Sequence, residues 1–199
     1  MKAGVGITDL STGLYMHGAI LAALQARHRT GLGQKLDGSL FETQVALLIN
    51  VAMGWLNLGQ EGERWGAQHP SVVPYDAFKT KDLYIVCGAV NDKQFLSLCK
   101  LVGKPELASD ERFNNNDVRV KHREELNAIL NELFVTKTTD EWLDEFKETT
   151  LPYGAINNME RVFDHPQTSA REMVAEVPFE AAKSGKISLL GTKVASDIH

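Results

Sequence analysis

The sequence has little cysteine, little proline and no long apolar run. Its 199 residues include two cysteines, Cys87 and Cys99, and six prolines. Because two thiols in a chain of this length do not make a disulfide framework, a reducing compartment suits them, and we expect both to be core thiols. The longest apolar segment stops well short of the roughly 18 residues that a membrane span needs. We therefore predict neither a disulfide-stapled fold nor a signal peptide nor a membrane span.

The chain also lacks an excess of positive charge and the common active-site motifs. Its net charge of -5 gives no basic field for nucleic acid, so an anionic ligand needs a local positive site. The six histidines are scattered without metal-ligand spacing, and no P-loop, C-x-x-C, H-E-x-x-H or G-x-S-x-G motif is present. The hydrophobic fraction of 43% and the charged fraction of 24% are typical of an ordinary globular protein. We predict no metal, nucleic-acid or membrane site.

The first third of the chain shows a helix, strand and helix pattern. Apolar residues at helical spacing predict a mostly buried helix over residues 12–28, which Gly31 and Gly33 should end. Residues 34–40 resemble a short strand, and residues 41–58 resemble a second helix. This order is typical of part of an α/β layer fold.

The remaining chain predicts a smaller α+β unit that follows a linker rich in Gly, Pro and charge. The expected strands cover residues 75–78, 83–87, 174–179 and 186–190, and the expected helices cover residues 92–102, 118–133, 139–146 and 159–163. We thus divide the chain into residues 1–58 from a large domain, a linker at 59–74, a small domain at 75–180 and a return segment at 181–199.

Asp9 lies in GVGITDLSTG, where a glycine-rich entry meets the first predicted helix. An Asp at a helix start accepts backbone N–H bonds and complements the helix dipole, an effect of about 1 kcal/mol. The same environment keeps the carboxylate ionised among glycines that let a substrate come close, so the carboxylate could attack an acyl carbon or hold a proton-transfer position. The local sequence permits both the capping role and the chemical roles.

Five blocks of the chain resemble the family III CoA-transferases, the CaiB/BaiF type, and they occur in the family's order over nearly the whole length. They are GVGITDLSTGLYMHGAILAALQARHRTGLGQ from residue 4, GAQHPSVVPY from residue 66, GAVNDKQF from residue 88, PYGAINNM from residue 152 and VFDHPQ from residue 162. The resemblance implies an α/β fold, with part of a Rossmann-like large domain followed by a small domain of helices and a short antiparallel sheet. It also implies that the N-terminal Rossmann half, which supplies most CoA contacts in the family, lies outside this chain.

The resemblance assigns a reaction and a site. It implies transfer of CoA between dicarboxylic acids, from succinyl-CoA to glutarate or a similar acid, with Asp9 as the nucleophile that forms an aspartyl-acyl anhydride. It assigns substrate or CoA binding to Leu40, Gln68, His69, Tyr75 and Gly88. Coenzyme A then enters as a thioester substrate rather than a resident cofactor, and the partners are acyl-CoA and small carboxylic acids. A homodimer and a mitochondrial location, otherwise a cytoplasmic one, are further implications.

Several alternatives stay open at this stage. An α-methylacyl-CoA racemase shares the family fold and uses an aspartate at the position of Asp9. A noncatalytic fragment or interaction domain would keep the core of the small domain without an active cleft. His69 fits loop packing and a site role equally well, whereas packing is the simpler role for Tyr75.

Overall fold

The structure is a computed structural model that describes residues 4–191. The chain divides between Gly66 and Ala67 into two units, and this point falls inside the predicted linker, residues 59–74. The predicted boundaries near residues 58 and 180 stay predictions. The last eight residues of the predicted return segment, 181–199, lie outside the described residues.

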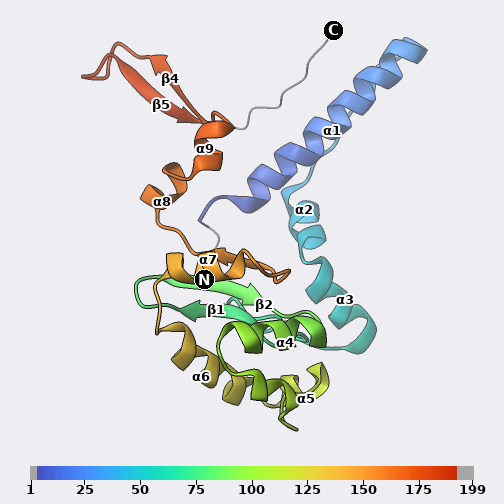
Figure 1. Ribbon diagram of the computed structural model, residues 1–199. Coiled ribbons are helices and arrows are strands. Elements are labelled where there is room, and N and C mark those ends of the chain that lie inside the picture. Colours follow the sequence, from blue (N-terminus) through green and yellow to red (C-terminus); the bar gives the residue numbers. More distant parts are fainter. Residues whose placement is uncertain (1–3, 192–199) are drawn as a thin grey trace. The chain divides into compact units, whose positions relative to one another are not determined.

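The first unit contains helices. They are α1 (Ile7–Thr30), α2 (Leu40–Leu47) and α3 (Ile49–Leu58). Figure 1 shows α1 as the long blue ribbon. It begins five residues before the predicted start and ends, as predicted, at Gly31, whose φ of 73° is the left-handed conformation that favours glycine. The predicted helix over residues 41–58 divides at Leu48, which ends α2 and precedes α3.

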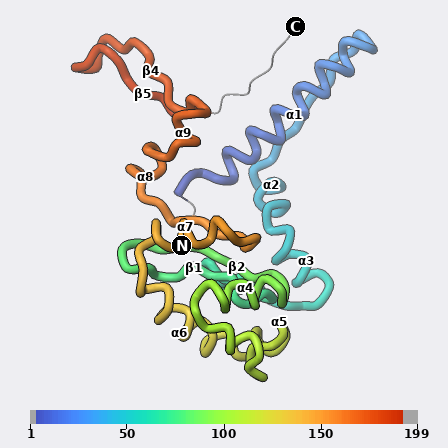
Figure 2. Tube along the Cα trace, viewed as in Figure 1, coloured from blue at the N-terminus to red at the C-terminus, as the bar shows by residue number. Residues whose placement is uncertain are grey.

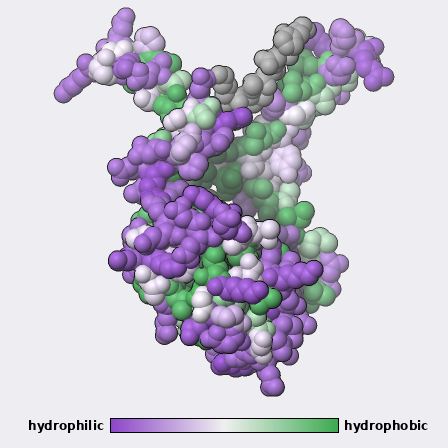
Figure 3. Space-filling model, viewed as in Figure 1, coloured by the Kyte–Doolittle hydropathy of each residue, from purple (hydrophilic) through white to green (hydrophobic). Residues whose placement is uncertain are grey.

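Two expectations for the first unit are wrong. Residues 34–40 form no strand, because no strand among the described residues pairs with this segment. Leu40 instead begins α2. The predicted burial of α1 also fails, because none of its residues is buried and Leu14 is 73% exposed. Figure 3 shows hydrophobic residues, in green, at the surface. The spacing of apolar residues predicts the helix correctly but not its exposure.

The second unit is built on a three-stranded antiparallel sheet, in the order β1, β2, β3. The strands are β1 (Tyr75–Lys79), β2 (Tyr84–Gly88) and β3 (Tyr153–Ala155). The β1–β2 hairpin confirms the predicted one, and its register pairs Tyr75 with Gly88 and Phe78 with Ile85. Because directly opposite residues of an antiparallel pair lie on the same face of the sheet, Phe78 and Ile85 are buried in the core together.

Helices follow the β1–β2 hairpin in the chain. They are α4 (Asp92–Leu101), the 3-10 turn η1 (Pro105–Ser109), α5 (Asn116–Lys121), α6 (Arg123–Phe134), α7 (Thr139–Phe146), α8 (Met159–Phe163) and α9 (Pro166–Ala170). Asn91 caps α4, and Thr138 forms a capping box with Glu141 at the start of α7. The predicted helix over residues 118–133 divides at His122, because the chain turns there between α5 and α6.

The core of the second unit is aromatic. The Phe134 ring lies 4.8 Å from that of Phe78 and 4.9 Å from that of Trp142, measured between ring centroids. The Trp142 indole N–H donates to the backbone carbonyl of Phe134, which satisfies the one polar group of this large side chain. Cys87 and Cys99 are buried free thiols, as predicted, and burial raises the pKa of Cys99 to about 12. They act as small apolar residues.

The final hairpin forms a separate sheet. Strands β4 (Val174–Pro178) and β5 (Lys186–Leu190) pair with each other, and Val177 lies opposite Ile187. The two strands were expected to close the small α+β unit, but among the described residues they pair with no strand of the three-stranded sheet. Figure 2 follows the red trace of this hairpin from α9. The combination of helices with small antiparallel sheets confirms the predicted α/β fold class with an α+β small domain.

Candidate functional site

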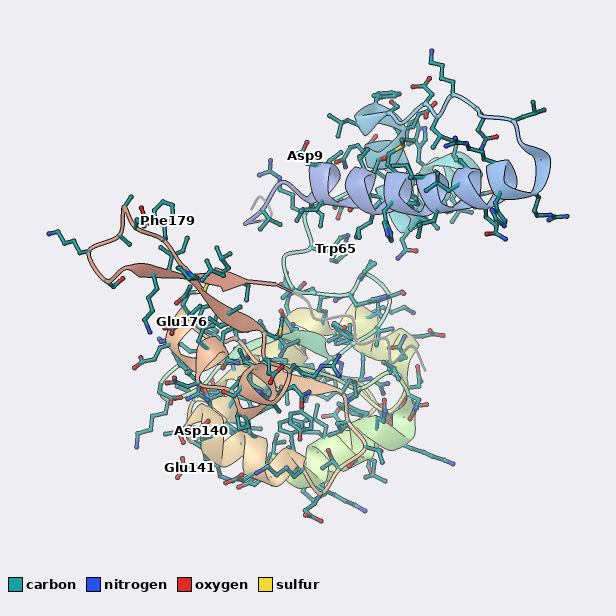
Figure 4. The ribbon with its side chains drawn as sticks, turned by 90° about the horizontal axis from the view of Figure 1, so that it is seen from above. Asp9, Trp65, Asp140, Glu141, Glu176 and Phe179 are labelled. Carbon is teal, nitrogen blue, oxygen red and sulfur yellow. The ribbon has the colours of Figure 1, made fainter. Side chains whose placement is uncertain are left out.

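Asp9 is exposed in the first turn of α1, as its third residue. The residue before the helix is Gly6, whose carbonyl accepts from the N–H of Leu10 at 3.0 Å, and no side chain caps the helix. The expectation that Asp9 caps the helix is therefore wrong, because the helix already begins at Ile7. Figure 4 shows Asp9 at the start of α1. The carboxylate still lies at the positive end of the dipole of a 24-residue helix.

Gly6 controls where the Asp9 carboxylate can lie. A Cβ atom built at Gly6 would be 2.6 Å from Oδ2 of Asp9, so any larger residue would force the carboxylate to move. Thr8, between them, donates a side-chain hydrogen bond to the Gln44 amide oxygen and ties the start of α1 to α2. Sequence reasoning noted the glycines as a group but missed this particular contact. The sequence signal for this contact is a glycine, Gly6, three residues before an aspartate, Asp9, at the start of a helix.

Leu40 is the first residue of α2 and is 51% exposed. A hollow of about 340 Å³ lies nearby in the first unit, between α1 and the start of α2. Thr12, one turn beyond Asp9, lines this hollow together with Tyr15, Asp37 and residues of α2, whereas neither Leu40 nor Asp9 does. The two predicted residues are thus accessible but lie outside the hollow.

Three of the other predicted residues lie together in the second unit. Gly88 pairs with Tyr75 across the hairpin, and a Cβ atom at Gly88 would lie 2.6 Å from Cδ2 of the Tyr75 ring. The His69 imidazole also lies near that ring, at 5.8 Å between centroids and an angle of 52°. The His69 N–H also donates to the Tyr75 carbonyl at 3.3 Å. Gly88 is therefore required for close packing of Tyr75, which in turn supports His69.

The Gln68 side chain forms a hydrogen bond within the second unit. Its Nε2 donates to Oδ2 of Asp76 at 2.9 Å, and the buried Asn127 donates to the same oxygen at 3.0 Å. The other carboxylate oxygen of Asp76 accepts from the N–H of Ala77 at 2.7 Å. Asn127 Oδ1 is a buried oxygen without a donor among the described residues. One N–H of the Gln68 amide is thus engaged in this network, which leaves its second N–H and its oxygen for a ligand.

Three side chains from α5 and α6 hold the segment from His69 to Val73, and sequence reasoning missed them. Arg123 donates to the carbonyls of His69 and Pro70, Asn116 donates to the carbonyl of Ser71, and Arg119 donates to the carbonyl of Val73. The signal available was an extended, proline-containing segment that needs donors for its carbonyls, with two arginines one helical turn apart, at positions 119 and 123.

A second hollow, of about 480 Å³, is lined by residues of α7, β3, α8 and the start of α9. Its arginine, Arg161, is paired with Asp140 at 2.5 Å and bonded to Asn157 at 3.1 Å. The hydrogen bond with Arg161 lowers the pKa of Asp140, and the same bond raises the pKa of Arg161. Because its cation is already paired, this hollow is a poor site for an anionic substrate.

Neither a metal centre nor a membrane segment is found in residues 4–191. No group of three or more His, Cys, Asp or Glu side chains there is arranged to hold a metal ion. None of the described helices is long and apolar enough to cross a bilayer.

Comparison with known proteins identifies the family. The sequence profile of CoA-transferase family III matches residues 1–197, and the chain belongs to this family. An acyl-CoA transferase from Fusarium pseudograminearum is 58% identical over 98% of this chain and 42% of its own length. The human succinyl-CoA:glutarate CoA-transferase is 45% identical over 98% of this chain and 44% of its own length.

The solved structures agree with the sequence comparison. A CaiB/BaiF family protein from Brucella suis has a TM-score of 0.77 and 36% identity, and the match covers 98% of this chain and 53% of that protein. This chain therefore spans about half the length of the relatives it matches. The named relatives are CoA-transferases, which does not favour the racemase alternative.

Proposed function

We propose that the protein transfers CoA from succinyl-CoA to glutarate or a similar dicarboxylic acid. The family supports transfer of CoA between carboxylic acids, and the names of the human and mouse relatives support this pair of acids. Other relatives are named for oxalate and mesaconate, so the acceptor acid is the least constrained part of the proposal. Coenzyme A takes part as a substrate thioester.

Asp9 is the proposed nucleophile. Its carboxylate attacks the thioester carbonyl of succinyl-CoA, the C–S bond breaks, and a mixed anhydride forms with release of CoA thiolate. The acceptor carboxylate then replaces the first acyl group, which leaves as the free acid. CoA thiolate attacks the second acyl group and regenerates the Asp9 carboxylate. Each tetrahedral intermediate needs hydrogen-bond donors at its oxyanion.

The observation that carries this proposal is the setting of Asp9. The carboxylate is exposed, lies in the first turn of a long helix and takes part in none of the ion pairs formed within residues 4–191. The helix dipole favours its ionised form, which is the nucleophilic one. Gly6 allows the carboxylate to take this position, because a Cβ atom there would lie 2.6 Å from Oδ2. A purely structural carboxylate would be expected to bond to a neighbour.

The test replaces Asp9 with Asn in the native protein that contains this sequence. We expect glutaryl-CoA formation to fall at least about 1,000-fold while the melting temperature stays near the parental value. An Asp in the first turn that does not cap the helix contributes only about 0.3–1 kcal/mol, through its interaction with the helix dipole. Asp117→Asn is the matched control, since Asp117 is also an acidic first-turn residue, in α5. Hydroxylamine should trap an acyl group on Asp9 in the parent alone. Undiminished turnover of Asp9→Asn would disprove the mechanism.

A noncatalytic role for the chain by itself is the alternative. Thermal-shift titration of the 199-residue chain with CoA distinguishes it, because a ligand bound only by the folded state raises apparent stability. We expect little or no shift, and a saturable shift would instead show a CoA site within this chain. The proposal extends, on the family resemblance alone, to a homodimer and a mitochondrial location. Sedimentation and imaging of the tagged native protein test these two points.

A further inference from the structure

The backbone around His69 is fixed on both sides by neighbouring groups. The His69 N–H donates to the Tyr75 carbonyl, and its own carbonyl accepts from Arg123 Nη1 at 2.8 Å. The next carbonyl, that of Pro70, accepts from Arg123 Nη2 at 2.7 Å. One guanidinium thus holds two successive carbonyls with two separate nitrogens, which a lysine ammonium does not reproduce with the same geometry.

The anchoring continues beyond His69. Asn116 donates to the Ser71 carbonyl at 2.8 Å, and its oxygen accepts from the N–H of Val73 at 3.2 Å. Arg119, which is fully buried, donates to the Val73 carbonyl at 2.7 Å. The segment is therefore held to α5 and α6 at most of its carbonyls, and the position of His69 is set by packing rather than by solvent.

The orientation of the His69 ring fixes its hydrogen-bonding capacity. Nδ1 lies 3.2 Å from the backbone nitrogen of Ser71, a group that can only donate, and 3.4 Å from the Ser71 hydroxyl, which can also donate to it. An imidazole nitrogen that accepts carries no proton, so in the neutral ring the proton is on Nε2. The ring packs against Tyr75 and is half-buried, and no residue from 67 to 191 accepts a hydrogen bond from Nε2.

We infer that His69 donates through Nε2–H to a carboxylate of the acid substrate, and that Arg123 is a positioning residue for this donor. The inference rests on the proposed function for the identity of the acid. A carboxylate suits the site because it accepts at both oxygens and because a hydrogen bond to a charged acceptor is about twice as strong as a neutral one. In this tautomer Nε2 has no lone pair for a proton, so His69 acts as a donor and not as a general base.

The first test measures the tautomer directly. Histidine-labelled 199-residue chain is examined by nitrogen NMR at a pH where the imidazole is neutral, and the His69 signals are assigned by their loss in His69→Gln. We expect a protonated Nε2 and an unprotonated Nδ1. A protonated Nδ1 would overturn the inference, because the ring would then present an acceptor to the substrate. This readout is independent of catalytic activity.

The second test compares two amide substitutions in the native protein. The amide nitrogen of Gln reaches close to the position of Nε2, whereas the amide group of Asn reaches only that of Nδ1, so Gln keeps the proposed donor position and Asn loses it. We expect His69→Asn to raise the KM for glutarate roughly 10- to 100-fold, the range for a lost hydrogen bond to a charged group, with the KM for succinyl-CoA unchanged. His69→Gln should stay within about threefold of the parent. Equal KM values for glutarate in His69→Asn and the parent would overturn the inference.

The third test addresses Arg123. Arg123→Lys should raise the KM for glutarate several-fold and broaden the His69 nitrogen signals, because one of the two anchored carbonyls loses its donor. Arg112→Lys, which changes a half-exposed arginine elsewhere, is the matched control and should leave both unchanged. Unchanged His69 signals in Arg123→Lys would refute the positioning role.

Failure of the proposed function is distinguishable from failure of this inference. If the parent shows no transfer of CoA, the proposed function fails. The donor role of His69 is then tested by titrating the native protein with glutarate and following the His69 Nε2 signal. A saturable shift of that signal, absent in His69→Asn, supports the donor role without any turnover. Saturable binding of glutarate without any shift of the His69 signal overturns the donor role.

Discussion

Arg119 offers the sharpest test of how the second unit is held together. The guanidinium is fully buried and donates to the carbonyls of Val73 at 2.7 Å and Phe113 at 2.9 Å. It also pairs with Asp92 at 2.8 Å and lies 4.3 Å from the centre of the Phe95 ring. Arg119→Met keeps much of the volume and leaves two buried carbonyls without donors, at about 1–3 kcal/mol each. We expect a loss of about 3–5 kcal/mol in the free energy of unfolding.

The matched control is Arg112→Met. Arg112 pairs with two carboxylates, Asp110 and Glu125, whereas Arg119 pairs with one, but the Arg112 side chain is 48% exposed, so its pairs are hydrated and screened. Exposed pairs contribute about 0–1 kcal/mol.

Urea unfolding of the 199-residue chain measures both arginine variants through the fluorescence of the buried Trp142, in a background with Trp55→Phe and Trp65→Phe. With a urea slope of about 1–3 kcal/mol/M, the Arg119 variant should lower the midpoint by at least about 1 M. Losses that agree within 1 kcal/mol in the two variants would refute the reasoning, since burial would then not matter.

Two further predictions concern Gly88 and Asp82. Gly88→Ala should cost about 1–3 kcal/mol in urea unfolding, because its Cβ would lie 2.6 Å from the Tyr75 ring, whereas Gly154→Ala, with no atom within 4 Å, should change stability by less than about 1 kcal/mol. The backbone N–H of Thr139, the largest influence, helps to lower the pKa of Asp82 to about 2. The stabilisation by Asp82 is therefore complete above its unfolded pKa of about 3.9 and is lost as pH falls through about 2, so Asp82→Asn should destabilise at pH 6 and progressively less toward pH 2. A destabilisation that is independent of pH would contradict the assigned cause.

Local signals predicted the second unit well because its elements begin and end at residues with local causes. The Asn91 side chain accepts from the N–H of Gln94, and Gly103 has a φ of 74°, so the limits of α4 follow from its own sequence. The β1–β2 hairpin likewise follows from two apolar runs around a polar turn. The pattern of the site around Tyr75 and Gly88 was predictable only as a family resemblance, since the close contact of the ring with the glycine depends on register.

The start of α1 shows why other parts of the structure were harder to predict from the sequence. The predicted helix starts at residue 12, yet the Thr12 hydroxyl donates to the Thr8 carbonyl at 2.7 Å and is satisfied inside the helix. The helix therefore continues back to Ile7, which places Asp9 in the first turn rather than at the cap. The Arg119 and Arg123 anchors join residues about 50 positions apart, and periodicity carries no information about such pairs.

The last prediction concerns the stability of α1 in the 199-residue chain. None of its residues is buried, and Leu14 and Leu24 are 73% and 51% exposed, whereas Leu126 and Leu130 of α6 are fully buried. Isolated helices are marginal in water, so α1 should open locally while α6 opens only when the second unit unfolds. With ordinary stability of about 5 kcal/mol, amides of α6 should exchange roughly 1,000-fold more slowly than those of α1 by hydrogen exchange and mass spectrometry. Protection of α1 within tenfold of α6 would mean that its apolar residues are covered in solution. In that case the first turn that carries Asp9 would be held by packing as firmly as the core of the second unit.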